Sequence, residues 1–191
     1  MKLRKIGSIF LVLALVLAVV AGCGGKKPED TVSTALEAFK KLDFESATKC
    51  FVGEENPDEL KEALAEFEGL DEALFGKLTY KINEAKVDGD TATVNTSITN
   101  VDMVEVFSTY MTDVISLAFS EEFLSLSEEE QTKKVTQILI DKIKASDAKT
   151  KTIDVDISLK KEDGEWKIVG DDALANAMLG GMMDLASQLE F

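Results

Sequence analysis

The spacing of apolar residues divides the chain into helical and extended segments. Between Pro28 and Gly76, apolar residues recur every three or four positions, which is typical of amphipathic helices. Asp43 and Asn56-Pro57 supply the capping and first-turn residues that begin new helices, and Gly53 ends one. The pattern therefore predicts several short helices in the first part of the domain.

Alternation of apolar and polar residues starts at Leu78 and indicates β-strands. The alternation changes parity near Asn83-Glu84, which predicts a β-bulge, and Asp88-Gly89 is a hairpin-turn signal. A second alternating run over residues 152–159 precedes the turn signal Asp163-Gly164. We therefore expect two antiparallel hairpins that together supply about four strands.

Residues 102–147 separate the two β-hairpins and return to the helical period. Apolar residues cover a wide side of the first helix in this segment, in which only Glu105 and Asp113 are charged. Ser127 and Glu130 form the capping-box pattern that starts a second helix. We interpret the wide apolar side as core packing, with a face shared with a ligand or partner as the alternative.

A final helix is predicted after the last strand. Asp171 and Asp172 can cap it, and Gly180-Gly181 either weakens it or lets another element approach closely. The element order predicts an α+β fold: a curved antiparallel sheet of about four strands packed by N-terminal helices, with a helical-hairpin insertion at residues 102–147 and a C-terminal helix. The inward face of that helix is expected to carry Leu174, Met178, Met182, Leu185 and Leu189.

The N-terminus carries a targeting pattern. Basic residues at positions 2, 4 and 5 precede an apolar run that ends in Val20-Ala21-Gly22-Cys23, which is typical of a signal peptide. The run is shorter than the ~20 residues of a membrane span, although a single-pass anchor helix is the alternative. The small residues before Cys23 resemble the lipobox of bacterial lipoproteins. This resemblance implies cleavage between Gly22 and Cys23 and a diacylglyceryl thioether on Cys23.

We therefore divide the chain into a signal peptide at residues 1–22, a lipid-anchored tether at residues 23–30 and a single α+β domain at residues 31–191. Two or three acyl chains on Cys23 would hold the protein stably on a bilayer. The expected location is the outer face of the bacterial cytoplasmic membrane. The seven residues after Cys23 reach at most ~25 Å when extended, so the domain should lie close to the bilayer.

Composition narrows the possible chemistry. The chain has no histidine, which removes His-dependent catalysis and imidazole metal ligation. Its second cysteine, Cys50, is expected to be a small buried hydrophobe rather than a reactive thiol. Residues 1–22 contain three basic residues and no acidic ones, so the net charge of −15 becomes −18 in the mature chain. Such an acidic protein should not bind nucleic acid, whose affinity for proteins rests on neutralised phosphates.

Candidate site residues are few. Asp154 and Asp156 partly match a calcium loop, but Leu159 stands where that loop needs glycine, and strand alternation explains the spacing. We expect no metal, no cofactor and no catalytic residue. Five residues are candidates for lining a pocket, with core packing as the favoured interpretation: Tyr80, Phe107, Tyr110, Met111 and Trp166.

Three stretches resemble a known superfamily. Residues 35–47 resemble the opening helices, residues 88–94 the hairpin turn and residues 159–168 the closing hairpin of small bacterial lipoproteins in the nuclear transport factor 2-like, or cystatin-like, superfamily. In particular, the chain is similar to lipoprotein domains of unknown function. The resemblance implies a concave pocket, which the insertion could fill or cover, and it carries over no catalytic residue.

These observations lead to three hypotheses. The first is a non-enzymatic module that captures an apolar small ligand or a partner protein between the sheet and the helices. The second is an accessory or structural envelope lipoprotein that docks its helical insertion on a membrane partner. The third is an isomerase- or dehydratase-like enzyme, which would need an Asp or Tyr with a shifted pKa inside a pocket.

Overall fold

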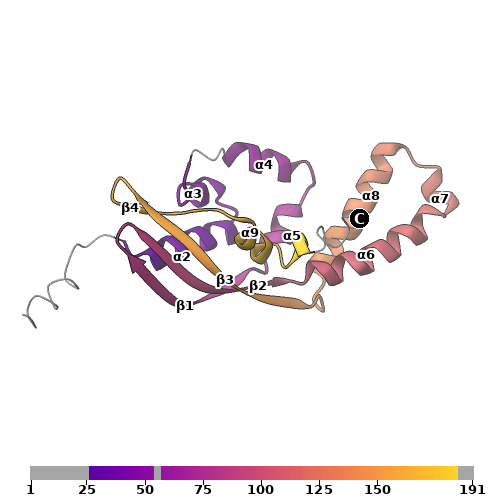
Figure 1. Cartoon of the computed structure of the whole chain (residues 1–191). Coiled ribbons are helices and arrows are strands. Elements are labelled where there is room, and N and C mark those ends of the chain that lie inside the picture. The colour runs from indigo at the N-terminus through magenta and orange to yellow at the C-terminus, as the bar shows by residue number, and fades with distance from the viewer. Residues whose placement is uncertain (1–25, 54–56, 185–191) are drawn as a thin grey trace, which may run out of the picture.

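A computed structural model describes residues 26–53 and 57–184 of the 191-residue chain. The predicted signal peptide, its cleavage site Gly22-Cys23 and the lipid-bearing Cys23 lie outside these residues. The described helices and strands follow one another in the order shown in Figure 1: α2 (Pro28–Lys40), α3 (Phe44–Thr48), α4 (Pro57–Ala65), α5 (Leu70–Phe75), β1 (Thr79–Asp88), β2 (Thr91–Val101), α6 (Met103–Ala118), α7 (Glu121–Leu124), α8 (Glu128–Lys144), β3 (Thr150–Glu162), β4 (Glu165–Ile168) and α9 (Asp172–Met178).

The strands form one antiparallel sheet in the order β1-β2-β3-β4. The register of β1 against β2 shifts between Ile82 and Glu84, which confirms the predicted bulge. Gly89 in the first turn, and Asp163 and Gly164 in the second, adopt the positive φ angles that tight hairpin turns require. The sheet with its packed helices confirms the predicted α+β fold class.

Helices cover one face of the sheet (Figure 1). Burial alternates along β2, so that Val94, Thr96 and Ile98 are fully buried while Asn95 and Ser97 are partly exposed. Helices α2 and α9 contact β2, and α2 brings Val32 and Leu36 into the same core cluster. These side chains fill the space beneath the sheet in which the resemblance implies a concave pocket.

The other face of the sheet is polar. Asn95 donates a hydrogen bond to Asp156 across β2 and β3 at 2.6 Å, and the hydroxyl of Ser97 donates to Asp154. Both aspartates are exposed and lie on alternate positions of β3. Strand alternation therefore accounts for their spacing, as predicted.

An aromatic cluster joins the N-terminal helices to one another. The ring of Phe39 lies 6.2 Å from that of Phe44, 6.1 Å from that of Phe51 and 5.5 Å from that of Phe75. Such edge-on and tilted pairs stabilise a core beyond the area that they bury. Cys50 lies next to this cluster in the chain and is buried, as expected.

The C-terminal helix is shorter than predicted. Helix α9 ends at Met178, because Gly180 and Gly181 both adopt positive φ. Gly180 also lies against the end of β2: a Cβ built on it would stand 1.8 Å from the carbonyl oxygen of Val101, and its own carbonyl accepts a hydrogen bond from the amide of Met103. Both effects expected of the two glycines are therefore present. The prediction of one continuous helix through Leu189 is wrong, because the helix is interrupted after Met178. Residues 185–191 lie outside the described residues.

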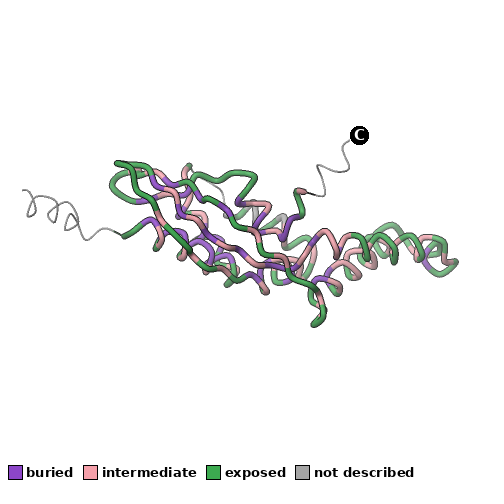
Figure 2. Tube along the Cα trace, turned by 60° about the horizontal axis from the view of Figure 1, so that its bottom comes forward, coloured by how far each residue is buried: buried purple, intermediate pink, exposed green. Residues whose placement is uncertain are grey.

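The insertion between β2 and β3 is a helical hairpin that projects from one end of the sheet (Figures 1 and 2). We call α6, α7 and α8 together the helical hairpin. Its base packs in a second core cluster that contains Val101, Met103, Val106, Ile140 and Ile143. Beyond this base, most of α6 is partly or fully exposed. Our interpretation of the whole apolar side of α6 as core is therefore wrong, because α7 and α8 contact only part of α6 and leave Met111 and Ile115 exposed.

Candidate functional site

Exposed apolar side chains gather on one part of the helical hairpin. Their exposed fractions are 38% for Met111, 53% for Ile115, 82% for Phe119 and 65% for Leu124. The first three are spaced by four residues, which places them along one side of α6 and its C-terminal end. We call these four residues the hairpin surface. Several exposed apolar residues on one element mark interaction sites more often than singly scattered ones.

Polar side chains hold the two long helices of the hairpin together. Lys142 on α8 pairs with Asp113 on α6 at 2.7 Å, and Lys134 pairs with Glu122 on α7 at 2.8 Å. At the tip, the side-chain amide of Gln131 donates hydrogen bonds to two backbone carbonyls of the α7 segment. The hairpin surface is therefore carried on a braced support rather than on a loop.

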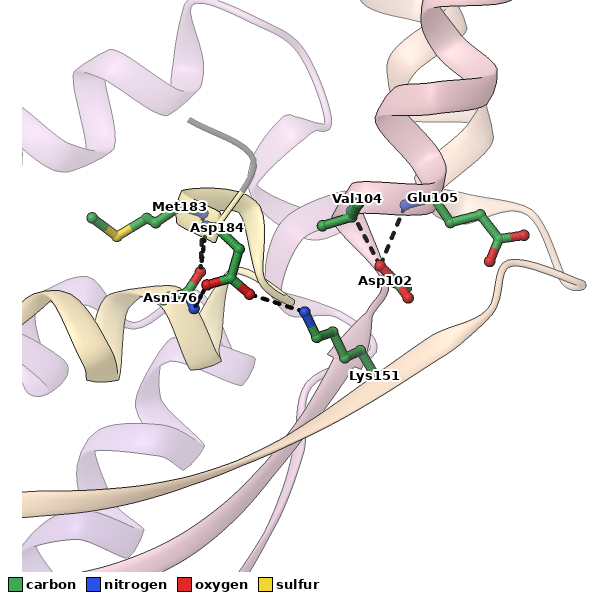
Figure 3. Close-up of polar contacts among 7 residues, drawn as sticks. All are labelled: Asp102, Val104, Glu105, Lys151, Asn176, Met183 and Asp184. Atoms are coloured by element: carbon green, nitrogen blue, oxygen red, sulfur yellow. Dashed lines mark hydrogen bonds and ion pairs between the residues drawn. The ribbon is translucent and has the colours of Figure 1, made fainter. Parts of the chain in front are cut away.

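Each long helix also begins at a side-chain cap. The Asp102 carboxylate accepts hydrogen bonds from the amides of Val104 at 3.1 Å and Glu105 at 3.3 Å (Figure 3). Ser127 and Glu130 form the predicted capping box at the start of α8. These contacts satisfy amides that have no partner inside the helix.

The base of the hairpin is fastened by two lysines that lie just before strands β1 and β3. Lys77 donates hydrogen bonds to the carbonyls of Ile143 and Ala145 at the end of α8, where a cation also complements the helix dipole. Lys149 pairs with Glu105 of α6 at 2.8 Å. The orientation of the hairpin is thus set by the sheet to which it is attached.

Beside the base, the segment after α9 is held by one polar cluster (Figure 3). Lys151 of β3 lies 3.0 Å from the carboxylate of Asp184, and Asn176 donates to the same carboxylate at 2.8 Å. The hydrogen bond from Lys151 holds the pKa of Asp184 below its ordinary value. Asn176 also accepts a hydrogen bond from the amide of Met183, which fixes the chain after the glycine pair.

Carboxylates that brace the hairpin are also held in their charged form. The hydrogen bond from Lys134 lowers the pKa of Glu122, and the hydrogen bond from Lys144 lowers that of Glu72 at the hairpin base. The backbone amide of Ser127 lowers the pKa of Glu130. All three groups are fully exposed, so each interaction is screened by solvent.

The five candidate pocket residues lie in two places. Tyr80 of β1 packs against the core beneath the sheet, with its hydroxyl 2.7 Å from that of Ser33. Trp166 of β4 is buried in the same core and lines a cleft at its outer edge. By contrast, Phe107 and Tyr110 lie on α6 with their rings 6.0 Å apart, and Met111 follows on the exposed side. The structure brings together the three α6 residues but separates them from the other two.

Two features of the described residues bear on chemistry. Burial raises the pKa of the Cys50 thiol, so it is protonated at neutral pH and is a poor nucleophile. Within residues 26–53 and 57–184, no three His, Cys, Asp or Glu side chains lie in an arrangement that could hold a metal ion. In the same residues, no helix is both long enough and apolar enough to span a bilayer.

Sequence reasoning kept docking through the helical insertion as an alternative, but of the four residues of the hairpin surface it named only Met111 as a candidate. The signal was present, because only two residues of α6 are charged and its apolar side is wider than one packed partner helix requires. It also missed the grouping of Lys26, Lys49 and Lys167 around the cleft at Trp166. No sequence signal indicates that grouping, since the three lysines are far apart in the chain.

Comparison with known proteins places the chain in a family. No curated protein matches it. A crystal structure of ycdA from Bacillus subtilis subsp. subtilis str. 168, provisionally described as a lipoprotein, is similar with 19% sequence identity and a TM-score of 0.44. The similarity covers 69% of this chain and 48% of that one, so the chain spans about half the length of that structure. The nuclear transport factor 2-like relationship stays a prediction. A family model matches residues 26–182, and the chain therefore belongs to the family described as domain of unknown function DUF5105.

Proposed function

We propose that this protein is a lipid-anchored, non-enzymatic docking protein that presents its hairpin surface to a partner protein outside the bacterial cytoplasmic membrane. The observation that carries the proposal is the cluster of Met111, Ile115, Phe119 and Leu124 on a braced helical support. An exposed apolar cluster is costly in water unless a partner covers it.

The position of the hairpin supports a partner away from the anchoring bilayer. Lys26, the first described residue, lines a cleft with Gly164 and Glu165 of the β3–β4 turn. The hairpin leaves the opposite end of the sheet from this turn (Figure 1). The eleven residues of β2 span about 35 Å, and the sixteen residues of α6 add up to about 24 Å. A protein anchored through Cys23 would thus hold the hairpin surface well above the lipid.

Charge around the hairpin surface indicates the chemistry of the partner. Five glutamates and no basic residue lie between Phe119 and Thr132, around the tip of the hairpin. The complementary partner surface is an apolar groove with basic residues at its rim. Such a groove suits helix-in-groove recognition, in which apolar residues on successive turns of one helix face act as anchors.

A partner protein is favoured over the apolar small ligand of the first hypothesis. The space between the sheet and α2 is occupied by fully buried side chains such as Leu36, Val94 and Ile157. Protein interiors of this kind are close-packed and leave few voids larger than a water molecule. The geometry therefore supports the second hypothesis, docking through the insertion.

Site-specific crosslinking in living cells tests the proposal. A photo-reactive phenylalanine analogue replaces Phe119 in the full chain, and the matched control carries it at Val87, which is 57% exposed on β1. We expect one protein to crosslink from position 119 and not from position 87, and Ile115→Asp to abolish that crosslink without changing the amount of folded protein. A crosslink between two copies of this chain, or equal crosslinking from both positions, would contradict the proposal.

Removing the hairpin gives a second test. Val101 and Thr150 are paired across β2 and β3, so a short Gly-Ser linker can replace residues 103–147 without displacing either strand. We expect the sheet to fold and the partner to be lost. If the partner is still crosslinked to the shortened protein, docking through the hairpin is excluded.

The lipid anchor rests on the sequence motif and has its own test. Cys23→Ala should release the protein from the membrane fraction, because one thioether carries the acyl chains that hold it there. Retention of this variant in the membrane would support the single-span alternative instead.

A further inference from the structure

We propose that a cleft between α2, α3 and β4 binds the headgroup of an anionic phospholipid of the membrane that anchors the chain. The cleft has a volume of about 410 Å³, which lies within the range of small-molecule sites. Its lining includes Lys26, Lys49, Cys50, Trp166 and Lys167. The inference uses the proposed lipid anchor only to place the cleft near the bilayer, and it is independent of the hairpin surface.

Three lysines converge on the cleft from distant parts of the chain. Lys26 precedes α2, Lys49 is the C-terminal cap of α3, and Lys167 lies on β4. Glu165 is the single carboxylate among the lining residues, so the rim is cationic in a protein whose net charge is −15. This local excess of positive charge runs against the overall composition.

The three lysines differ in how closely they are paired with carboxylates of the protein. Lys49 pairs with Glu45 at 2.6 Å on the exposed side of α3, and Lys167 pairs more loosely with Glu165 at 3.4 Å. Lys26 has no hydrogen-bond or ion-pair partner among the residues that the structure describes. At least one cation at the rim is therefore available to an added anion.

Lys167 fastens β4 to the end of α3 beside the cleft. Its ammonium donates a hydrogen bond of 2.7 Å to the backbone carbonyl of Lys49, which joins β4 to the end of α3. Lys26, Lys49 and Lys167 line the same cleft as Cys50. Burial raises the pKa of the Cys50 thiol, and the charges of Lys167 and Lys26 partly oppose that rise.

The floor of the cleft is apolar and aromatic. Trp166 is 7% exposed and Cys50 is 9% exposed, and the ammonium of Lys161 lies 4.9 Å from the centre of the indole ring. Tryptophan is enriched where one side of a site is apolar and the other meets water, as at membrane interfaces. An apolar floor beneath a cationic rim matches a phospholipid headgroup, in which a glycerol unit adjoins a phosphate.

The distance along the chain favours a lipid over free phosphate. Lys26 follows Cys23 by three residues, which span at most about 11 Å. The cleft is thus held within reach of the headgroup layer, where the local concentration of lipid phosphate is high. Basic residues near an anionic leaflet add attraction that falls off within a Debye length, so only lysines close to the anchor can benefit.

The only tryptophan of the chain supplies the readout, because Trp166 lines the cleft. The full-length protein is reconstituted in phosphatidylcholine vesicles with 0 to 40% phosphatidylglycerol, and the emission maximum and acrylamide quenching of Trp166 are followed. We expect a saturable blue shift and reduced quenching as the anionic fraction rises. Inorganic phosphate added to pure phosphatidylcholine vesicles should not reproduce them.

Matched lysine variants make the test specific. Lys26→Gln and Lys49→Gln should each raise the anionic fraction needed for half-saturation about five-fold, whereas Lys134→Gln, which breaks a similar exposed ion pair on the hairpin, should leave it unchanged. Identical emission in both lipids, equal effects of all three variants, or a full response to inorganic phosphate would each overturn the proposal. Failure here leaves crosslinking at Phe119 unaffected, so the two proposals fail separately.

Discussion

The sheet body and the helical hairpin use the same apolar residue types in opposite ways. We define the sheet body as residues 26–53, 57–101 and 150–184. In it, Leu78 and Ile98 are fully buried, and the core is continuous from α2 to α9. In the hairpin, Ile115 and Phe119 project into solvent, although they stand in an equally apolar stretch. Figure 2 shows the change as the buried trace of the sheet body gives way to an exposed one.

The difference teaches that an apolar stripe becomes core only where another element reaches it. Helix α2 lies against the sheet, whereas α6 contacts α7 and α8 and still leaves Met111 and Ile115 exposed. The hairpin compensates with caps and ion pairs, such as the Ser127 cap and the pair between Lys142 and Asp113. Its stability therefore depends more on polar contacts than that of the sheet body.

The largest expected effect is the difference in stability between alanine variants of two isoleucines, one in the sheet core and one on the hairpin. Ile157→Ala removes a side chain that is 1% exposed in the sheet core and should lower the free energy of unfolding by about 3 kcal/mol. Ile115→Ala, at 53% exposure on the hairpin, should change it by less than about 0.5 kcal/mol. Urea unfolding followed by Trp166 fluorescence measures both. Equal losses would show that the hairpin surface is packed and would remove the contrast.

The next largest effect is the loss of stability when alanine replaces a glycine at the junction of the two regions. Gly89 and Gly180 have φ angles of 60° and 58°, so alanine at either position meets the same backbone strain of ~1–2 kcal/mol. A Cβ at Gly89 meets nothing within 4 Å, whereas one at Gly180 would lie 1.8 Å from the Val101 carbonyl oxygen. Gly180→Ala should therefore cost a further ~1–3 kcal/mol. Similar urea midpoints for both variants would indicate that the contact is not tight.

A smaller effect is expected from removing the N-terminal cap of a helix in each region. Ser127 accepts a hydrogen bond from the Glu130 amide on α8, and Asp171 accepts one from the Leu174 amide on α9. Replacing either by alanine should cost ~1 kcal/mol of helix stability. Because α9 packs on the core, Asp171→Ala should lower the urea midpoint. Ser127→Ala should instead accelerate amide hydrogen exchange at the start of α8 alone. Global destabilisation by Ser127→Ala would show that the hairpin unfolds together with the sheet.

The smallest expected effect is the acid sensitivity of the polar contacts in the hairpin. Glu122 and Glu130 have pKa values below the ordinary 4.5, because Lys134 and the Ser127 amide stabilise their charged forms. The stability that they contribute is present above pH 4.5 and is lost as the pH falls through their lowered values. The protection of amides in α7 and α8 against hydrogen exchange, relative to the unfolded chain at the same pH, should therefore fall between pH 5 and pH 3.

Two charge-neutral variants check the acid effect. Glu130→Gln keeps a capping side chain without a titrating group and should flatten the pH dependence at the start of α8. Glu129→Gln removes the same charge beside the cap and should leave that dependence in place. Simultaneous opening of the sheet and the hairpin in acid would contradict the division into two regions.

Much of the fold follows from local rules. The bulge near Asn83, the turn at Asp163-Gly164 and the cap at Ser127 are each specified by a few adjacent residues, and all three are present in the structure. The same local rules predicted a last helix that is too long. Gly180 lies against Val101 with a positive φ angle, and this backbone conformation interrupts the helix. The five candidate pocket residues were chosen by type and spacing, which do not report spatial proximity.

The sequence by itself determined the order and type of the elements, the α+β class and the expected anchor motif at Cys23, because each depends on residues within a few positions of one another. Tertiary structure alone decided which apolar faces are covered. Burial of α2 and exposure of α6 depend on contacts between residues that are tens of positions apart, and the same holds for the lysines at the Trp166 cleft. Hydrophobic burial is non-directional, so a helical period shows that a face is apolar and leaves open what covers it.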